Sequence, residues 1–549
     1  MPAGGNRLPA LPLCLKAVVL TMSSTCPPLD PARSGSAAVA CAPVSYASVS
    51  STPHVALQLL AVCLAALAMP LSFTGPAVAL PALRDALGGS PVQMAWVTNA
   101  FMLSFGATLM ACGALADAWG RKRVFLCGVG VVAVSAVGLA SAGSIVAFNL
   151  WRAVQGVGAA AALAGGTSAL AQAIQGPARL RAFSWVGTAF GVGLAFGPLL
   201  AGWLLGHGGW RAVVLCVAGV AMVAGVAGAR FLRDSRDPAA AGLDLPGAAS
   251  FTAALALLTL GVLQAPESGW ASLPVLAALA GSVAMAGVFV RTERRVRHPM
   301  LDLSLFRYPR FVGVQLLAAA PAYAFVVLLV LLPVRFIGVE GLSALATGQL
   351  MLALSGAMLF VPLAAGWLAR WWSPAALSAG GLAVCAVGLW WLSDCPPGSP
   401  AAVLVGPLAL IGVGIGLPWG LMDGLAVSVV PPERAGMATG IFNTVRVAGE
   451  GLALALVGAG LVALVALQWP QVPGADALRA GQYLVAGDLP HALRLLPGLS
   501  QADVLQAYGR AFSTLLRVLA GVTVFTAVAV FACLRLGAAR GAAVSTIEG

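Results

Sequence analysis

Ionisable side chains inside long apolar runs are the residues of this sequence that could do chemistry. Glu450 lies in the run 436–466, four residues after Arg446, and Asp423 lies in the run 401–429. Burial raises the pKa of a carboxylate, so that it can bind and release a proton near neutral pH, and a nearby cation opposes that rise in pKa. Because residues four apart share a helix face, Arg446 and Glu450 could form a static ion pair or one that substrate or protons break. Asp423 could equally be a polar residue near a helix end.

A second polar group lies in the run 146–170, where Arg152 and Gln155 are one helical turn apart. An arginine inside an apolar helix is costly and usually faces a polar cavity or a partner. Arg152 is therefore a cavity candidate, with a structural ion pair or a side chain that reaches the membrane boundary as the alternatives. Asn443 could offer hydrogen bonds to a substrate or pack at a helix end.

The elements that position these side chains must be membrane helices. Of the 549 residues, 60% are hydrophobic and only 9% are charged, whereas soluble domains carry about 25% charged residues. Apolar runs of about 20 residues recur, each long enough to cross a bilayer as a helix. We predict an all-α membrane protein with about fourteen spans. They lie near 55–80, 93–115, 124–142, 146–170, 183–206, 211–232, 247–264, 272–290, 311–334, 345–369, 374–392, 401–429, 436–466 and 511–534.

The basic residues lie in short clusters after the second, fourth, sixth and eighth predicted spans. Positive charge in every second connection marks the cytoplasmic side, so both termini should be cytoplasmic. The net charge of +12 does not indicate nucleic-acid binding, because no basic run is interleaved with aromatic residues. We therefore expect a lipid bilayer as the surroundings of this chain.

The spans also predict a domain division. A polar connection at 468–510 should be a long external loop with short interfacial helices. The predicted parts are a disordered N-terminal tail at 1–52, a six-helix bundle at 53–232, two additional helices with a cytoplasmic linker at 233–310, a second six-helix bundle at 311–536 and a C-terminal tail at 537–549.

The connection after the second span carries a motif of small and charged residues. It contains Gly113, Asp117, Gly120, Arg121 and Arg123. The glycines permit a tight connection, while one carboxylate among cations can act as a conformational latch that opens and closes. The alternative is a positively charged membrane anchor with an incidental aspartate.

A second motif lies in the predicted span 183–206. It places Gly193, Gly197, Pro198 and Gly202 at spacings that form a smooth helix face, and the proline favours a bend. Such a helix could act as a pivot between two bundles while sealing them against ion leak. Ordinary membrane packing is the alternative interpretation.

Together these motifs and the helix count resemble the fourteen-helix drug:proton antiporter family of the major facilitator superfamily, which includes multidrug exporters. The resemblance covers 55–536. It implies two six-helix bundles plus two extra central helices, with a central cavity open alternately to each side. It also implies that Asp117 meets the start of the penultimate span near Ala435 and Gly436, where the helix dipole favours a carboxylate. A monomer without cofactor or metal is expected.

The first span departs from this family pattern. Related exporters usually carry an aspartate in this span, where this chain has Ser72, followed by Thr74. Serine cannot titrate near neutral pH, so Ser72 cannot replace a proton-carrying acid. If protons drive this protein, Asp423 or Glu450 must carry them.

The leading hypothesis is a proton-coupled exporter of amphipathic or cationic small molecules in a bacterial inner membrane. With Ser72 replacing the acid and Arg152 in the cavity, an anionic metabolite is an alternative substrate. A transporter-derived accessory or sensor protein is another alternative. An enzyme is not expected, because the apolar runs hold no histidine cluster or nucleophile constellation. The sequence carries no evidence for or against a periplasmic adaptor.

Overall fold

The structure is a computed structural model, and it describes residues 53–174, 177–236, 244–296, 301, 303–430 and 435–545. The N-terminal tail predicted at 1–52 lies outside the described residues. The C-terminal tail predicted at 537–549 begins as a continuation of the last helix, which runs to Ser545.

The described residues form helices and connections, without strands. The helices are α1 Pro53–Leu87, α2 Pro91–Trp119, α3 Arg121–Ala140, α4 Ile145–Ala173, α5 Pro177–Phe231, α6 Leu245–Ser268, α7 Leu273–Glu293, α8 Pro309–Pro321, α9 Val327–Pro333, α10 Ala344–Ser355, α11 Val361–Leu368, α12 Pro374–Ser393, α13 Ala401–Ser428, α14 Ala435–Ala466, α15 Gly474–Val485, α16 Leu489–Leu495 and α17 Gln501–Ser545. Shorter 3-10 turns are η2 Leu303–Arg307 and η5 Gly356–Leu359, and π-helical turns are η3 Ala322–Val326 and η4 Val334–Val339.

Thirteen helical segments of the described residues are long and apolar enough to cross a membrane. One of them, Ala182–Phe231, has non-helical backbone at Gly209, where φ is 67°. This break lies between the predicted spans 183–206 and 211–232, so the two predicted spans are joined into α5. An all-α membrane protein with about fourteen spans is therefore confirmed.

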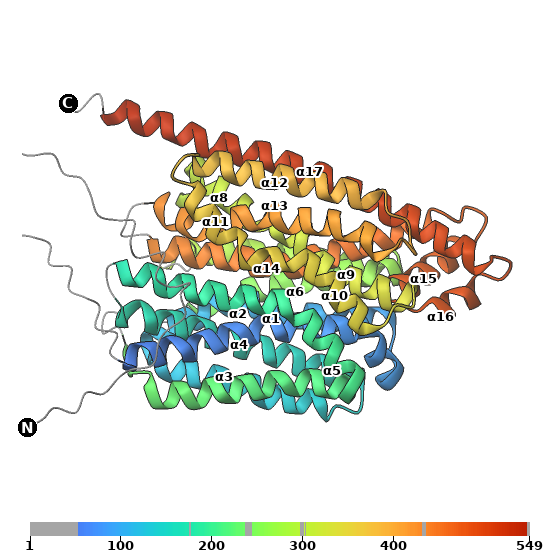
Figure 1. Cartoon of the computed structure of the whole chain (residues 1–549), viewed down its shortest axis with the longest axis horizontal. Coiled ribbons are helices and arrows are strands. Elements are labelled where there is room, and N and C mark those ends of the chain that lie inside the picture. The colour runs from blue at the N-terminus through green and yellow to red at the C-terminus, as the bar shows by residue number, and fades with distance from the viewer. Residues whose placement is uncertain are drawn as a thin grey trace, which may run out of the picture. The chain divides into compact units, whose positions relative to one another are not determined.

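The helices form two halves. In the first half α1 packs on α5, while α2 and α3 pack on α4. In the second half α12 lies between α13 and α17, and α17 also contacts α8 (Figure 1). The additional helices α6 and α7 pack on each other, and α6 touches both α2 and α14. The extra pair therefore borders the contact between the two halves.

Two seams join the halves, α2 against α14 and α5 against α10. A β-carbon on Gly106 would lie 2.5 Å from the backbone nitrogen of Ala448, and one on Gly202 would lie 2.3 Å from the carbonyl oxygen of Ala344. Real β-carbons do not approach other atoms this closely, so both contacts require glycine. The two halves are thus held in direct backbone contact at each seam.

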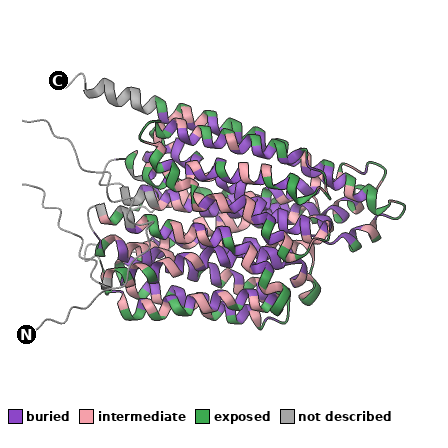
Figure 2. Ribbon diagram, viewed as in Figure 1, coloured by how far each residue is buried: buried purple, intermediate pink, exposed green. Residues whose placement is uncertain are grey.

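Large apolar side chains face outward from the helices. Leu273, Phe525 and Val226 are 81%, 75% and 73% exposed. Figure 2 shows buried and exposed residues alternating along the same helices, so that each helix has an inner and an outer face. Exposed apolar surface of this extent fits lipid as the surrounding solvent.

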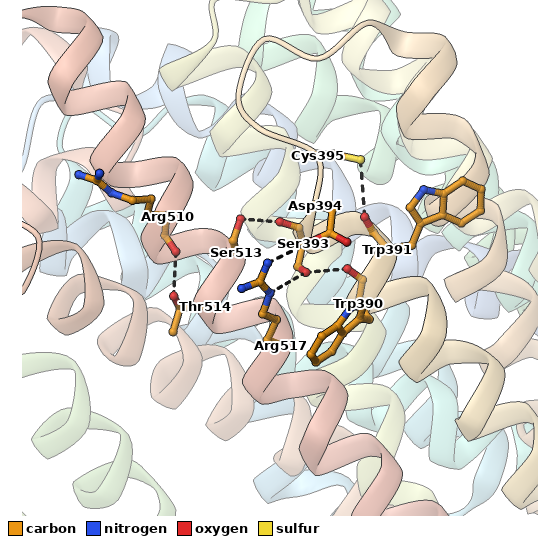
Figure 3. Close-up of polar contacts among 9 residues, drawn as sticks. All are labelled: Trp390, Trp391, Ser393, Asp394, Cys395, Arg510, Ser513, Thr514 and Arg517. Atoms are coloured by element: carbon orange, nitrogen blue, oxygen red, sulfur yellow. Dashed lines mark hydrogen bonds and ion pairs between the residues drawn. The ribbon is translucent and has the colours of Figure 1, made fainter.

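Hydrogen bonds and an ion pair connect the end of α12 to α17 (Figure 3). Ser513 Oγ donates to the carbonyl of Ser393 at 2.5 Å, and Arg517 Nε donates to Ser393 Oγ at 3.2 Å. Arg517 also pairs with Asp394 at 3.0 Å. These bonds fix the position of the last membrane helix against its neighbour.

The close approach at the α2–α14 seam predicts different responses at two glycines. Gly106→Ala should lower the free energy of unfolding by about 1–3 kcal/mol, because the added methyl group must push the helices apart. Gly130→Ala is the control, since a β-carbon there meets no atom within 4 Å and alanine favours the helix by about 1 kcal/mol. Thermal unfolding in detergent measures both, and equal unfolding temperatures for the two variants would contradict the seam.

Candidate functional site

The ionisable candidates of the second half lie on α13 and α14. Arg446 NH1 is 3.6 Å from Asp423 Oδ1, and the Arg446 guanidinium lies 5.6 Å from the ring centres of both Trp419 and Phe442. Within the described residues Arg446 thus forms an ion pair with a carboxylate of another helix, and Glu450 lies one turn further along α14. The packing of α13 on α14 brings Asp423 to Arg446, a neighbour that spacing along one helix does not reveal.

Glu450 is buried one turn beyond Arg446, whose charge acts on it. Its neighbours along α14 face α2: Ala448 meets Gly106, and a β-carbon on Gly451 would lie 3.1 Å from Met102 Cβ. Glu450 therefore lies in the segment of α14 that forms the seam with the first half. Asn443, half-buried, lies one turn before Arg446 on the same helix.

An aromatic contact connects this group to the first half. The rings of Phe190 on α5 and Trp419 on α13 are stacked, with centres 6.4 Å apart and an angle of 30°. The same Trp419 ring also lies 5.6 Å from the Arg446 guanidinium. The coupling cluster is defined as Trp419, Asp423, Phe442, Arg446 and Glu450. It contacts α5 through Trp419, and its member Glu450 lies in the segment of α14 that forms the seam with α2.

Arg152 is fully buried and holds three helices of the first half together. Its Nε donates to the carbonyl of Val97 on α2 at 2.7 Å, and NH1 donates to the carbonyl of Ser72 on α1 at 2.7 Å. NH1 also donates to Gln155 Oε1 on α4 at 2.5 Å. The sequence correctly placed Arg152 and Gln155 on one face, and the structure adds Ser72 to them.

The bond from Arg152 to Ser72 has a cause in α1. Pro76 lacks a backbone N–H, so the carbonyl four residues earlier, that of Ser72, loses its helical donor. In a membrane such a carbonyl needs another partner, and Arg152 supplies it. The Ser72 hydroxyl donates instead to Ala68 O at 2.7 Å, and the Thr74 hydroxyl to Pro70 O at 2.9 Å. Both hydroxyls, predicted as cavity groups, are buried and bonded within α1.

The small residues of α5 serve two different contacts. A β-carbon on Gly197 would lie 2.2 Å from Thr74 Oγ1, and one on Gly193 would lie 2.9 Å from Leu67 O, so both pack on α1. Gly202 and the carbonyl of Pro198 instead face α10, at Ala344 and Gly348. The small residues of α5 therefore pack on α1 within the first half and on α10 of the second half.

The motif after α2 forms a polar hub at one end of the first half. Gly120 turns the chain with φ 121°, and Asp117 Oδ1 accepts from Arg121 Nε at 3.0 Å and NH2 at 2.8 Å. Arg121 also bonds Gln172 on α4, and Arg123 Nε lies 3.3 Å from Asp234 Oδ2 beyond α5.

A β-carbon added to Gly113 would have no other atom within 4 Å. The predicted contact of Asp117 with the start of α14 concerns Ala435 and Gly436, whose side chains lie outside the described residues.

One buried ion pair was missed by the sequence reasoning. Arg335 Nε lies 2.6 Å from Glu340 Oε1, with side chains 1% and 4% exposed, and Arg335 NH2 donates to Cys395 O at 3.3 Å. The pair lies on and just beyond the π-helical turn η4, where residues five apart share a face. The available signal was two opposite charges at that spacing directly after the apolar run 311–334.

Among the described residues, no group of three or more His, Cys, Asp and Glu side chains could hold a metal ion.

Comparisons with known proteins agree with these features. The family model of the Major Facilitator Superfamily matches residues 60–454. The Cephamycin export protein CmcT of Amycolatopsis lactamdurans is 36% identical over 397 residues, 69% of this chain and 79% of that protein. The Tetracenomycin C resistance and export protein of Streptomyces glaucescens is 29% identical over 413 residues, 73% and 74% of the two chains.

Solved structures share the fold. A bacterial homologue of the human lysosomal transporter Spinster, in an inward-facing and occupied conformation, matches with a TM-score of 0.61 and 16% identity over 88% of this chain and 97% of that one. A proton-dependent oligopeptide transporter matches with a TM-score of 0.55 and 17% identity over 87% and 98%. The predicted resemblance in fold and family is confirmed.

If Arg152 replaces the donor that Pro76 removes from the Ser72 carbonyl, the effects of substitutions at Arg152 and Pro76 on stability should not be additive. Arg152→Met should cost about 1–3 kcal/mol of stability, because it leaves the Ser72 carbonyl without a donor. In a Pro76→Ala background the restored N–H can take that carbonyl, so the same change should cost at least about 1 kcal/mol less. Thermal unfolding of the four proteins in detergent gives this coupling. Strictly additive effects would contradict the account.

Proposed function

Because this chain belongs to the major facilitator superfamily, we propose that it is a proton-coupled exporter of small molecules that works by alternating access. Two of its relatives are named as export proteins, one for tetracenomycin C and one for cephamycin. In the proposal the chain works as a monomer in a bacterial inner membrane, with both termini in the cytoplasm, as the positions of its basic clusters suggest.

The observation that carries proton coupling is the place of Glu450. It is a buried carboxylate on the helix that forms a seam, next to an arginine already engaged by Asp423. When the halves move, the surroundings of such a carboxylate change between buried and open, and its tendency to hold a proton changes with them. Glu450 is therefore proposed as the proton carrier that Ser72 cannot be.

The coupling to substrate is proposed to run through Arg446 and Trp419. Arg446 lies between the carboxylate of Asp423 and two aromatic rings, and Trp419 contacts Phe190 of the other half. A substrate that inserts between these rings would displace Arg446 and alter its effect on Glu450. Binding energy for the substrate would thereby favour release of the proton.

The movement itself is proposed to occur at the two seams. In this fold type two bundles rock about a site between them. The backbone contacts at Gly106 and Gly202 lie on different helix pairs, so one seam can open while the other stays closed. The hub at Asp117 and Arg121 would then fix the first half as one rigid body, including the ends of α4 and α5.

Efflux from everted membrane vesicles tests the proposal. We expect a proton gradient to drive uptake of at least one compound from a panel of tetracenomycin C, a cephamycin, a lipophilic cation and an organic anion. Collapse of the gradient should stop the uptake. Uptake that continues without the gradient would contradict proton coupling, and transport of the anion alone would favour the anionic alternative.

Substitution of Glu450 tests its role against an exposed glutamate. Glu450→Gln should abolish gradient-driven uptake, by at least about tenfold, while substrate exchange without a gradient persists, because the amide mimics the protonated acid. Glu267→Gln is the matched control and should keep gradient-driven uptake, since Glu267 on α6 is exposed and lies outside the coupling cluster. The idea fails if Glu450→Gln transports with an unchanged dependence on pH.

A further inference from the structure

A cavity of about 100 Å³ lies between the two halves, beginning at Leu454, one turn along α14 beyond Glu450 of the coupling cluster. Its walls come from α1, α2 and the additional helix α6 on one side, and from α9, η4, α14 and α15 on the other. Most of its lining is apolar, as at Leu263, Leu331 and Leu454. The additional helix α6 and the helix α15 thus contribute to a cavity between the two halves, although neither belongs to the coupling cluster or to the two seams.

Two buried amide side chains on the wall of this cavity each have one atom without a hydrogen-bond partner. Asn99 on α2 is 1% exposed, and its Nδ2 donates to Ala95 O at 3.0 Å while its Oδ1 has no hydrogen bond. Gln482 on α15 is 6% exposed, and its Nε2 has no hydrogen bond. A buried polar atom without a partner costs about 1–3 kcal/mol. The two side chains that line the cavity therefore carry one buried acceptor and one buried donor without partners.

This pair of groups defines a ligand chemistry. A hydroxyl or amide N–H would donate to Asn99 Oδ1, and a carbonyl or hydroxyl oxygen would accept from Gln482 Nε2. No ionisable residue lines the cavity, and a charge without a partner is strongly disfavoured in such a place. The remaining walls would hold an apolar body. The lining thus fits an uncharged, mainly apolar molecule with an amide or hydroxyl group.

We propose that this cavity is a binding subsite for an uncharged, mainly apolar small molecule, held through Asn99 and Gln482. The acceptor belongs to the first half and the donor to the second, so a rocking movement would separate them and dissolve the subsite. The inference rests on the proposed transport function and adds the class of substrate to it. It also gives α6 and α15 a role, because both contribute to the lining.

A second feature lies next to the subsite. Arg84 at the end of α1 pairs with Asp488 before α16, with 3.6 Å between Nε and Oδ2 and with side chains 18% and 5% exposed. Leu80, one turn before Arg84, and Ala486, two residues before Asp488, both line the cavity. In this conformation the ion pair thus connects the two walls of the cavity that the ligand would also bridge.

Binding to the purified full-length protein in nanodiscs tests the subsite, with phenol and benzamide as uncharged probes small enough for a cavity of about 100 Å³ and tetraphenylphosphonium as a cationic probe. Asn99→Leu and Gln482→Met should each weaken binding of the uncharged probes by about tenfold or more and leave the cation unaffected. Both variants should keep or raise the unfolding temperature, because each removes an unpaired buried atom. A structural role for these amides would instead lower it.

Gln315→Leu is the matched control. Gln315 on α8 is also buried, with both amide atoms unpaired, but it does not line the cavity. Its substitution should leave all affinities within about twofold.

The subsite is wrong if neither uncharged probe binds saturably, or if folded Asn99→Leu and Gln482→Met bind both probes as the unchanged protein does. It is also wrong if both variants unfold at lower temperature with unchanged affinity, which would indicate amides bridged by internal water. Proton-driven uptake into vesicles is measured separately. If the unchanged protein shows proton-driven uptake but the variants bind the uncharged probes normally, the subsite alone is refuted. If the variants lose binding of these probes but the unchanged protein shows no proton-driven uptake, proton coupling alone is refuted.

Discussion

The contact of helix backbones at glycine is the constraint on which the rest of this structure depends. In lipid, apolar side chains gain little by leaving their surroundings, so helices associate where small residues let them come close. Gly106 against Ala448 and Gly202 against Ala344 provide such places between the two halves. In the coupling cluster, Glu450 lies on the segment of α14 that forms the first seam, and Trp419 contacts Phe190 on α5, the helix of the second seam.

A second constraint distinguishes the polar groups that support the fold from those that are free to act. The Ser72 carbonyl, deprived of its donor by Pro76, is taken by Arg152. Arg335 and Glu340 satisfy each other in a buried pair. Arg152 NH2 and both amide atoms of Gln315 also lack a partner, but neither residue lines the cavity. Asn99 and Gln482 differ from them because both line one cavity between the two halves.

Much of the fold was predictable from the sequence, because span length and charge alternation respond directly to bilayer thickness and sidedness. The shared face of Arg152 and Gln155 was also predictable from helix geometry alone. The partner of Arg446 was not, since Asp423 belongs to another helix and only packing brings it near. Nor could an α-helical period reveal Arg335 and Glu340, because a π-helical turn sets their common face. The subsite depends on α15 approaching α2, a contact between segments almost four hundred residues apart for which no local pattern exists.

The central claim, that the halves rock about two glycine seams, is tested most directly by distances between spin labels in a variant without its native cysteines. One label pair replaces Asp85 at the end of α1 and Ala475 on α15, and the other replaces Trp185 on α5 and Trp371 after α11, all of them exposed. The account predicts that addition of substrate together with a change of pH lengthens one distance while it shortens the other. Two distances that stay constant, or that change in the same direction, would contradict it.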